Sequence, residues 1–338
     1  MNFITQAGRE LTSRMLVRLF YPLFIVCYTI TCHAGDLSAK VVVHWVPQAQ
    51  FAGYYVARDA GIYKKHGLDV KILPGGPNVS VSDCMKAGKA DFGTTFLLNA
   101  TKLHARGLPM VNIAQISRRS ALMLVAKKSS GICEPRDMNG KKIGIYKDDF
   151  SDVPLAFIKG NNLSVQIIPI ATGIHMFLHG GTDVTNAMWY NEYHTILNCG
   201  YNPDELSLFY MADYGFNVPE DGLYCLQSTY SENPDLCRRL VEATMEGWLY
   251  AFQHPDEALE IVINEMKKEH IPANLAHQQW MLARMQDIIM PAGEAKLSTF
   301  LTRDVYEMSG RILINNGSIT ELPAYDNIYI PVGKYAQE

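Results

Sequence analysis

The hydrophobic pattern of this chain changes repeatedly between a strand type and a helix type. Short apolar runs such as residues 39–45 alternate with amphipathic segments such as residues 51–60, and the alternation starts again after Gly131 with the run 142–146. Strands separated by helical segments are typical of βαβ units, which build mostly parallel sheets flanked by helices. The two series therefore predict an α/β fold made of two lobes.

The last third of the chain is predicted to be helical. Asn233 and Pro234 suit the N-cap and the first position of a helix, and apolar residues such as Val241 and Trp248 then recur at helical spacing. A further helix is expected from Pro255. We interpret these apolar stripes as core positions and not as cofactor-binding residues.

The N-terminus has the features of an export signal. Residues 1–18 carry three arginines against one acid, Glu10, and the uncharged run Leu19–Thr31 follows. This run is too short for a comfortable membrane span, and a pattern resembling a small-x-small cleavage site precedes Gly35. We therefore predict a signal peptide over residues 1–34 and a mature protein in the periplasm or another extracytoplasmic compartment. An uncleaved anchor is the alternative.

Charge and cysteine content argue against several classes of function. Removing residues 1–34, with three arginines and one glutamate, takes the formal charge from −4 to −6, and an acidic chain argues against a nucleic-acid partner. Five widely spaced cysteines remain, so no disulfide scaffold is indicated; a Cys225–Cys237 pair stays open, although separate buried thiols are the simpler interpretation. His175 and His179 lack an evident third ligand, so we expect no metal and no cofactor.

Aromatic residues gather at two predicted strand ends. Trp45 ends the first strand, with Phe51 and Tyr54 on the first turn of the helix that follows, and Trp189 and Tyr190 end a later strand. In parallel sheets, ligands bind beyond the carboxyl ends of the strands. The two clusters are therefore predicted to close as plates on a flat ligand. The alternative is that most of these rings pack over the strand ends of their own sheets as part of the core.

Polar residues accompany both aromatic clusters. Gln48 and Gln50 follow the first, and Asn191 and Glu192 follow the second, where they would contact the polar edge of the ligand. Glu192 starts a predicted helix, so it either accepts hydrogen bonds from the ligand or stabilises the helix through its dipole. Arg118 follows another strand end and either grips an anionic group or is one of two solvated arginines on a loop.

Several segments in combination resemble one family of proteins. These segments are WVPQAQFAGYYVARDAGIYKKHGLDVKILPGG, AGKADFGTT, ARGLPMVNIAQI, MNGKKIGIY and WYNEY. From about residue 39 to about residue 230, the chain resembles the extracytoplasmic solute-binding proteins related to thiamine-pyrimidine synthase. Members of that family serve ABC importers for pyrimidine precursors of thiamine, riboflavin, or sulfonates and similar small molecules.

The resemblance implies a type II periplasmic-binding fold. In this fold two strands cross between the lobes as a hinge, and the ligand lies in the interlobe cleft. We place the first lobe at residues 35–128, the second at 129–224, and the return to the first lobe with the C-terminal helices at 225–338. Asp213 falls near the second crossing, where it either faces the cleft or shapes the return strand.

The enzyme branch of the family requires groups that this chain lacks. The resemblance places Thr95 where the synthases carry the lysine that binds pyridoxal phosphate, and Asn99 where they carry a catalytic histidine. Threonine forms no Schiff base and asparagine relays no proton at neutral pH, and the cysteine-rich metal motif is missing from the sequence. We therefore predict no enzymatic activity and expect Thr95 and Asn99 to line a binding site.

The leading hypothesis is a monomeric, non-enzymatic solute-binding protein. It would capture a small planar nitrogen heterocycle, such as a thiamine-pyrimidine precursor, and present it to an ABC permease. The alternative is a ligand-sensing clamshell that signals to a membrane sensor kinase, and a pyrimidine-precursor synthase is disfavoured. The predicted ligand-binding residues are Trp45, Gln50, Phe51, Tyr54, Thr95, Asn99, Arg118, Trp189, Tyr190, Asn191, Glu192 and Asp213.

Overall fold

The computed structural model describes residues 36–147, 150–292 and 296–337. The predicted signal peptide, residues 1–34, lies outside the described residues. In the part of the chain that is described, no helix combines the length and the apolar character needed to cross a bilayer.

The first sheet has five strands in the order β2-β1-β3-β10-β4. Four of them run in the same direction, and β10 runs antiparallel to both of its neighbours. Every residue of β3 and β4 is buried, as expected for strands covered on both faces. The strands are β1 (Leu37–Val42), β2 (Leu68–Leu73), β3 (Phe92–Phe96), β4 (Met110–Gln115) and β10 (Asp221–Leu226).

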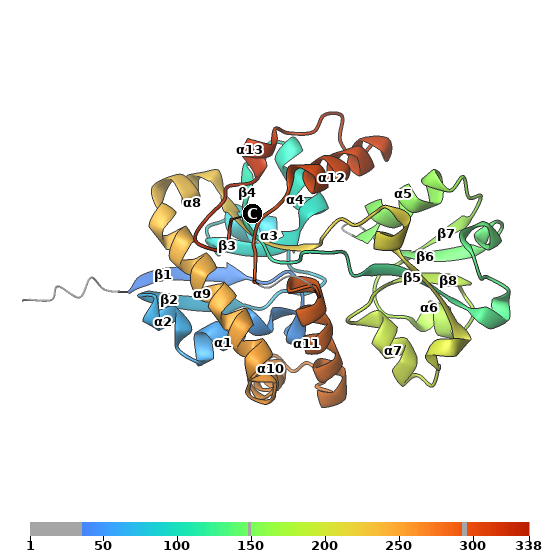
Figure 1. The fold of residues 1–338 in the computed structure, drawn as a ribbon, viewed down its shortest axis with the longest axis horizontal. Coiled ribbons are helices and arrows are strands. Elements are labelled where there is room, and N and C mark those ends of the chain that lie inside the picture. Colours follow the sequence, from blue (N-terminus) through green and yellow to red (C-terminus); the bar gives the residue numbers. More distant parts are fainter. Residues whose placement is uncertain (1–35, 148–149, 293–295, 338) are drawn as a thin grey trace, which may run out of the picture. The chain divides into compact units, whose positions relative to one another are not determined.

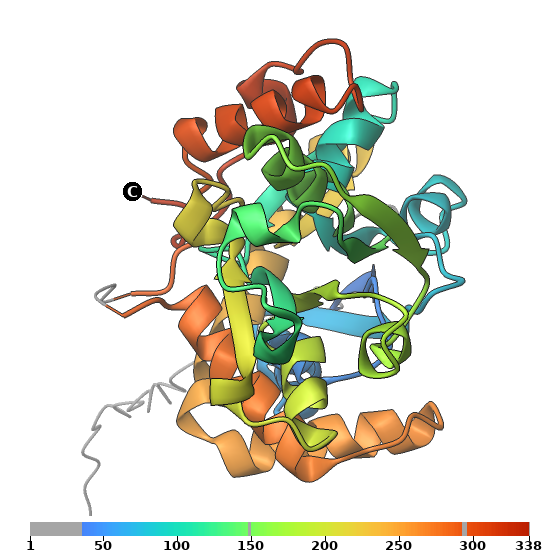
Figure 2. The same cartoon turned by 90° about the vertical axis from the view of Figure 1, so that its right-hand side faces the viewer.

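The second sheet repeats this plan in the order β7-β6-β8-β5-β9. Here β5 is the strand that runs antiparallel to both neighbours, while β6 is parallel to β7 and β8. The second sheet faces the viewer in Figure 2. Its strands are β5 (Leu122–Lys127), β6 (Lys142–Tyr146), β7 (Gln166–Ile170), β8 (Val184–Met188) and β9 (Leu206–Tyr210).

Helices flank both sheets, and those that follow β10 pack on the first sheet and its helices (Figure 1). The helices are α1 (Ala52–Asp59), α2 (Ile62–Lys65), α3 (Val81–Lys86), α4 (Leu97–Ala105), α5 (Asp152–Gly160), α6 (His175–Leu178), α7 (Glu192–Asn198), α8 (Gln227–Glu232), α9 (Pro234–Gln253), α10 (Pro255–Lys268), α11 (Leu275–Ile289), α12 (Arg303–Asn315) and α13 (Tyr325–Ile328). Short 3₁₀ turns include η1 (Ala49–Phe51) and η6 (Met211–Tyr214).

The predicted fold class is confirmed, but the predicted lobe boundaries come too late along the chain. The chain changes sheets between β4 and β5, over residues 116–121, and again between β9 and β10, over residues 211–220. The boundaries predicted after residues 128 and 224 therefore assign all of β5 and most of β10 to the wrong lobe. The strand β9 was not predicted. Hydrophobic pattern identifies a strand, but not the sheet that it joins.

Helix α1 lies close against α9 because glycines occupy the contact. A Cβ atom on Gly53 would lie 2.4 Å from the indole ring of Trp248, and one on Gly247 would lie 2.3 Å from the carbonyl oxygen of Gly53. Tyr54 packs edge-on against Trp248, with ring centroids 6.4 Å apart, and is 2% exposed, while Phe51 is 1% exposed. These two rings belong to the core and do not form the predicted ligand plate.

Candidate functional site

A cleft of about 760 Å³ lies where the carboxyl ends of strands from both sheets meet. From the first sheet it is lined by His44 and Trp45, which follow β1, and by residues 76–82, which are the loop after β2 and the start of α3. From the second sheet it is lined by Tyr146 at the end of β6 and by residues 190–192 after β8. This is the position at which α/β sheets bind ligands.

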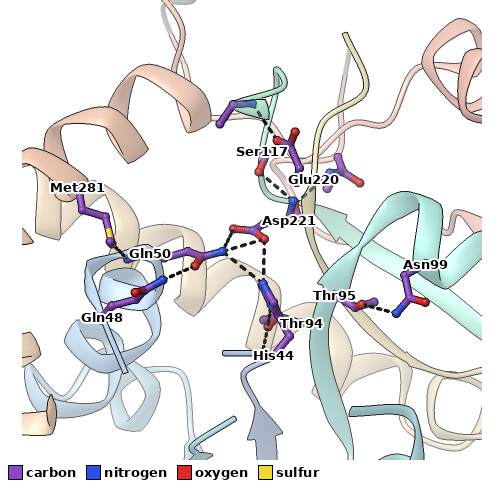
Figure 3. A network of polar contacts seen from close by, with 12 residues as sticks. His44, Gln48, Gln50, Thr94, Thr95, Asn99, Ser117, Glu220, Asp221 and Met281 are labelled. Atoms are coloured by element: carbon purple, nitrogen blue, oxygen red, sulfur yellow. Dashed lines mark hydrogen bonds and ion pairs between the residues drawn. The ribbon is translucent and has the colours of Figure 1, made fainter. Parts of the chain in front are cut away.

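Gln50 lies at the centre of a polar network on the first-sheet side of the cleft (Figure 3). Its Nε2 donates to the carboxylate oxygens of Asp221 at 2.9 and 3.2 Å and lies 3.3 Å from His44 Nε2. Its Oε1 accepts from Gln48 Nε2 at 2.6 Å. The second ring nitrogen of His44, Nδ1, lies 2.8 Å from Thr94 Oγ1. The network links the turn after β1 to the start of β10.

Burial disfavours charge on both titratable members of this network. It lowers the pKa of His44 to about 3 and raises the pKa of Asp221 to about 7, against the opposing effect of the hydrogen bond from Gln50. The His44 Nε2 and Asp221 Oδ1 atoms are 3.5 Å apart, which is within ion-pair range. Because both shifts favour the neutral forms, we interpret the pair as a neutral hydrogen-bonding element and not as an ion pair.

Glu220 joins the two segments that cross between the sheets. Its carboxyl group is 2.5 Å from Ser120 Oγ and accepts from the backbone N–H of Ala121 at 3.0 Å. A third hydrogen bond links the same segments, in which Asn217 Oδ1 accepts from the backbone N–H of Ser120 at 2.9 Å. Burial raises the pKa of Glu220 to about 8. The side chain that connects the crossings is therefore mostly protonated at neutral pH.

The raised pKa of Glu220 predicts that stability falls as the pH rises. Its pKa is higher in the folded than in the unfolded protein, so its contribution is complete below about pH 4.5 and is lost as the pH passes through about 8. The free energy of unfolding should therefore decrease between pH 5 and 8 by roughly 3–4 kcal/mol, given about 1.36 kcal/mol per pKa unit. Glu220→Gln, which stays neutral and keeps one donor and one acceptor, should remove most of this slope.

Urea unfolding at pH 5, 6, 7 and 8 measures the slope. Asp221, with a pKa raised to about 7 by burial, should leave a smaller residual slope in the Gln variant. The matched control is Glu321→Gln, at an exposed position, which should keep the slope of the unmodified protein. An equal slope in the Glu220 variant would contradict the assignment.

Glu192 provides a half-buried carboxylate on the second-sheet side of the cleft. Its Oε2 accepts from the backbone N–H of Met188 and its Oε1 from Asn191 Nδ2, both at 2.9 Å. Burial raises its pKa, and these hydrogen bonds oppose the rise. The backbone N–H of Glu192 itself is a third donor, and a carboxylate has about four acceptor sites, so capacity for a further donor remains. This leaves Glu192 able to accept hydrogen bonds from a ligand.

The structure brings most of the predicted binding residues to one place. The residues that line the cleft are Trp45, Gln50, Thr95, Asn99, Tyr190, Asn191 and Glu192, together with Gln48. Thr95 and Asn99 contact each other, because Asn99 Nδ2 donates to Thr95 Oγ1 at 3.0 Å.

Three further predicted residues lie outside the lining of the cleft. The guanidinium group of Arg118 donates to the carbonyl oxygen of Phe300. Asp213 is exposed on η6. Trp189 points away from its neighbour Tyr190, and its ring contacts the guanidinium group of Arg284, with the guanidinium carbon 4.8 Å from the ring centroid.

Several residues of the site were not predicted. His44 and Tyr146 line the cleft. Both lie at the carboxyl ends of strands, β1 and β6, so the rule that ligands bind beyond the carboxyl ends of strands could have identified them. Asp221 had no such signal, because it reaches Gln50 only through the pairing of β10 with β3.

Comparisons with known proteins identify the family and the fold of this chain. A family model described as NMT1/THI5 like matches residues 48–258, which is more than half of the chain. The chain belongs to the NMT1/THI5-like family. The matched region contains Gln50, Glu192 and Asp221, but it ends before α11.

The relatives within the NMT1/THI5-like family include binding proteins and enzymes. The riboflavin-binding protein RibY of Chloroflexus aurantiacus is 24% identical over 233 residues, covering 66% of this chain and 65% of that protein. The formylaminopyrimidine-binding protein of Halalkalibacterium halodurans is 21% identical over 274 residues, covering 78% and 81%. A 4-amino-5-hydroxymethyl-2-methylpyrimidine phosphate synthase of Saccharomyces cerevisiae, THI11, is 29% identical over 116 residues, covering 34% of each chain.

The solved structures establish the fold of this family member. The periplasmic aliphatic sulphonate-binding protein SsuA of Escherichia coli superposes with a TM-score of 0.68 at 13% identity, covering 89% of this chain and 94% of SsuA. The ligand-binding component of an ABC-type import system from Staphylococcus aureus gives a TM-score of 0.65 at 10% identity, covering 87% and 97%. The fold is that of the periplasmic binding proteins, as the sequence resemblance predicted.

Proposed function

We propose that this protein is an extracytoplasmic solute-binding protein that captures a small planar nitrogen heterocycle, such as a thiamine-pyrimidine precursor, for an ABC importer. The observation that supports this most directly is the cleft itself, which joins Trp45 of one sheet with Tyr190 and Glu192 of the other. Two relatives are named for binding riboflavin and formylaminopyrimidine, which are nitrogen heterocycles of the same chemical class.

The aromatic residues of the cleft suit a flat ligand. Trp45, Tyr146 and Tyr190 line it from both sheets. Offset contacts between such rings and a heterocycle contribute roughly 0.5–1.5 kcal/mol each beyond burial. The half-buried carboxylate of Glu192 would then accept hydrogen bonds from an exocyclic amino group or a protonated ring nitrogen of the ligand.

The charge of the cleft disfavours a strongly anionic ligand. Among the described residues that line it, Lys147 is the one with a fixed positive charge, and its side chain is exposed. The other basic group, His44, has its pKa lowered to about 3 by burial. Sulfonates and phosphates are usually held by bidentate arginines or by several donors. A neutral or cationic heterocycle fits the cleft better.

The groups present favour binding over catalysis. Thr95 and Asn99 lie in the cleft, where the resemblance to the synthases calls for a lysine and a histidine. Because some relatives are named as synthases, catalysis is the competing function. It would need a nucleophile and a proton relay that these two side chains do not supply.

One experiment separates these functions. Protein purified without denaturation is analysed by native mass spectrometry for a co-purified ligand, and calorimetry then measures the affinity for 4-amino-5-hydroxymethyl-2-methylpyrimidine, its formylamino analogue and riboflavin. We expect stoichiometric binding of a pyrimidine and no turnover when pyridoxal phosphate and iron are added. Sustained product formation would overturn the proposal, as would failure to bind any of the three compounds.

The proposed export of the protein leads to a separate prediction about its N-terminus. If residues 1–34 are a signal peptide, the mature protein should begin near Gly35, and N-terminal sequencing of protein recovered outside the cytoplasm measures this directly. An intact Met1 on the exported protein would show that the segment is retained.

A further inference from the structure

Helix α11 holds the turn that carries Gln50. The side chain of Gln278, on α11, accepts a hydrogen bond from the backbone N–H of Ala49 at 2.7 Å, and the backbone N–H of Gln50 points to the sulfur of Met281 at 3.2 Å. The first-sheet side of the cleft is therefore fixed to this helix.

The same helix also contacts the second-sheet side of the cleft at α7 (Figure 1). His277 Nε2 lies 3.0 Å from Asn191 Oδ1, and Trp280 Nε1 donates to the carbonyl oxygen of Trp189 at 3.1 Å. Helix α11 therefore binds the cleft-lining segments of both sheets at once, so that its contacts with α7 depend on how the two sheets are placed.

The carboxylate of Glu192 determines the direction of a chain of hydrogen bonds into this contact. An ionised carboxylate only accepts, so Asn191 directs its Nδ2 to Glu192, at 2.9 Å, and its Oδ1 to His277. His277 must then carry its proton on Nε2. This leaves Nδ1 of the neutral ring as the acceptor for His194 Nδ1, at 2.9 Å.

While both rings are neutral, one proton order satisfies the contacts from Glu192 to His194. In that order both His194 Nδ1 and the exposed Asn198 Nδ2 carry hydrogens, so their 3.3 Å approach is not a hydrogen bond. A second proton on His277 can still be accommodated, because Nδ1 of His194 accepts from it when His194 carries its own proton on Nε2. Protonation of both rings would place two N–H groups face to face across 2.9 Å and is therefore incompatible with the contact between them.

We propose that His277 and His194 are positioning residues that orient the Glu192 carboxylate for the ligand only while α7 is docked on α11. We further propose that protonation of both imidazoles separates α7 from α11. The inference rests on the proposed function in one respect, since it takes Glu192 as the ligand's acceptor.

The surroundings of the pair oppose an additional positive charge. The guanidinium carbon of Arg284 lies 4.8 Å from the ring centroid of Trp280, on whose indole ring His194 also stacks at 4.8 Å. Burial lowers the pKa of His277 to about 4, with a further contribution from His194, and burial also lowers the pKa of His194. The charged and titratable groups that face this region are Glu192, Tyr193, Tyr210, Arg119, Arg284 and Asp287.

The sign of the pH effect follows from the lowered pKa. A histidine near its ordinary pKa of 6.5 when α7 is detached, and near 4 when it is docked, binds the proton mainly in the detached form. Docking is therefore unimpaired above about pH 7 and weakens as the pH falls toward 4, by roughly tenfold or more at pH 5 for one imidazole. Glu192, whose pKa is raised by burial, acts in the opposite direction, so a variant without the titrating ring is needed.

The test compares the full chain with His277→Gln and His277→Phe. The glutamine side chain can donate to Asn191 and accept from His194 without titrating, whereas phenylalanine only fills space. Calorimetry measures the affinity for 4-amino-5-hydroxymethyl-2-methylpyrimidine from pH 7.5 to 5. At pH 7.5 we expect the Gln variant to bind within about threefold of the unmodified protein and the Phe variant to bind tenfold or more weakly. Toward pH 5 the unmodified protein should lose about tenfold more affinity than the Gln variant.

A second measurement on the free protein keeps the inference independent of the ligand. Imidazole ¹⁵N spectra of the unmodified chain should show His277 neutral with its proton on Nε2 at pH 7, and titrating well below the ordinary range. A proton on Nδ1, an ordinary pKa, or identical pH profiles for the unmodified and Gln proteins would each overturn the inference. If the pyrimidine binds none of the three proteins, the proposed function fails, and the spectra still decide the proton order.

Discussion

Replacing Glu192 by glutamine is expected to weaken binding of an aminopyrimidine by about tenfold to a hundredfold. The substitution keeps the shape of the side chain but removes its charge, and a charge-assisted hydrogen bond in a site closed off from water contributes roughly 1.5–3 kcal/mol. At about 1.4 kcal/mol per decade, this corresponds to the stated loss. Burial raises the pKa of this carboxyl group and so favours its neutral form. A ligand that donates hydrogen bonds to the carboxylate has the opposite effect and favours the ionised form.

Calorimetry at pH 7.5 and thermal melting, applied to the same samples, separate this role from a structural one. Glu192 is the first residue of α7, where a negative charge is also favoured by the helix dipole. A lowered melting temperature with unchanged affinity would leave Glu192 with the dipole role alone. Asp204→Asn, which removes one negative charge at an exposed position of the second lobe, is the control for net charge and should bind as the unmodified protein does.

Adding a single methyl group at Gly53 is expected to destabilise the protein by about 1–3 kcal/mol, as overpacking in a close-packed core does. The new Cβ would lie 2.4 Å from two carbons of the Trp248 ring. Trp248 is fully buried and has no flexible end to move aside, so α1 and α9 would have to separate. Alanine has a higher intrinsic helix propensity than glycine by about 1 kcal/mol, and the steric cost should outweigh this gain.

Gly160→Ala is the matched control for this substitution. Gly160 ends α5, and a Cβ there would meet the ring of Phe216 at 3.5 Å, an ordinary contact distance. This variant should therefore be neutral or slightly stabilising in urea unfolding, while Gly53→Ala lowers the midpoint. If the Gly53 variant is as stable as the control, α1 and α9 can move apart at little cost in the free energy of unfolding, which would contradict the prediction.

The sequence alone was sufficient for the fold class and for part of the site. Buried parallel strands and amphipathic helices leave distinct hydrophobic periods in a sequence, which is why β6 and the starts of α9 and α10 agree with the prediction. The rule that ligands bind beyond the carboxyl ends of strands needs only the strand ends. It selected Trp45, Tyr190 and Glu192, which line one cleft, and their binding of a ligand stays a prediction.

Which way each side chain points was decided only by tertiary structure. Tyr54 was predicted to face the ligand, but α1 turns it onto Trp248 because the glycine contact brings α9 so close. Asp221 lies 171 positions from Gln50 in sequence, yet its carboxylate oxygens accept hydrogen bonds from Gln50 in the same network. No local pattern records such a contact, because it arises from the order in which distant strands pair within a sheet.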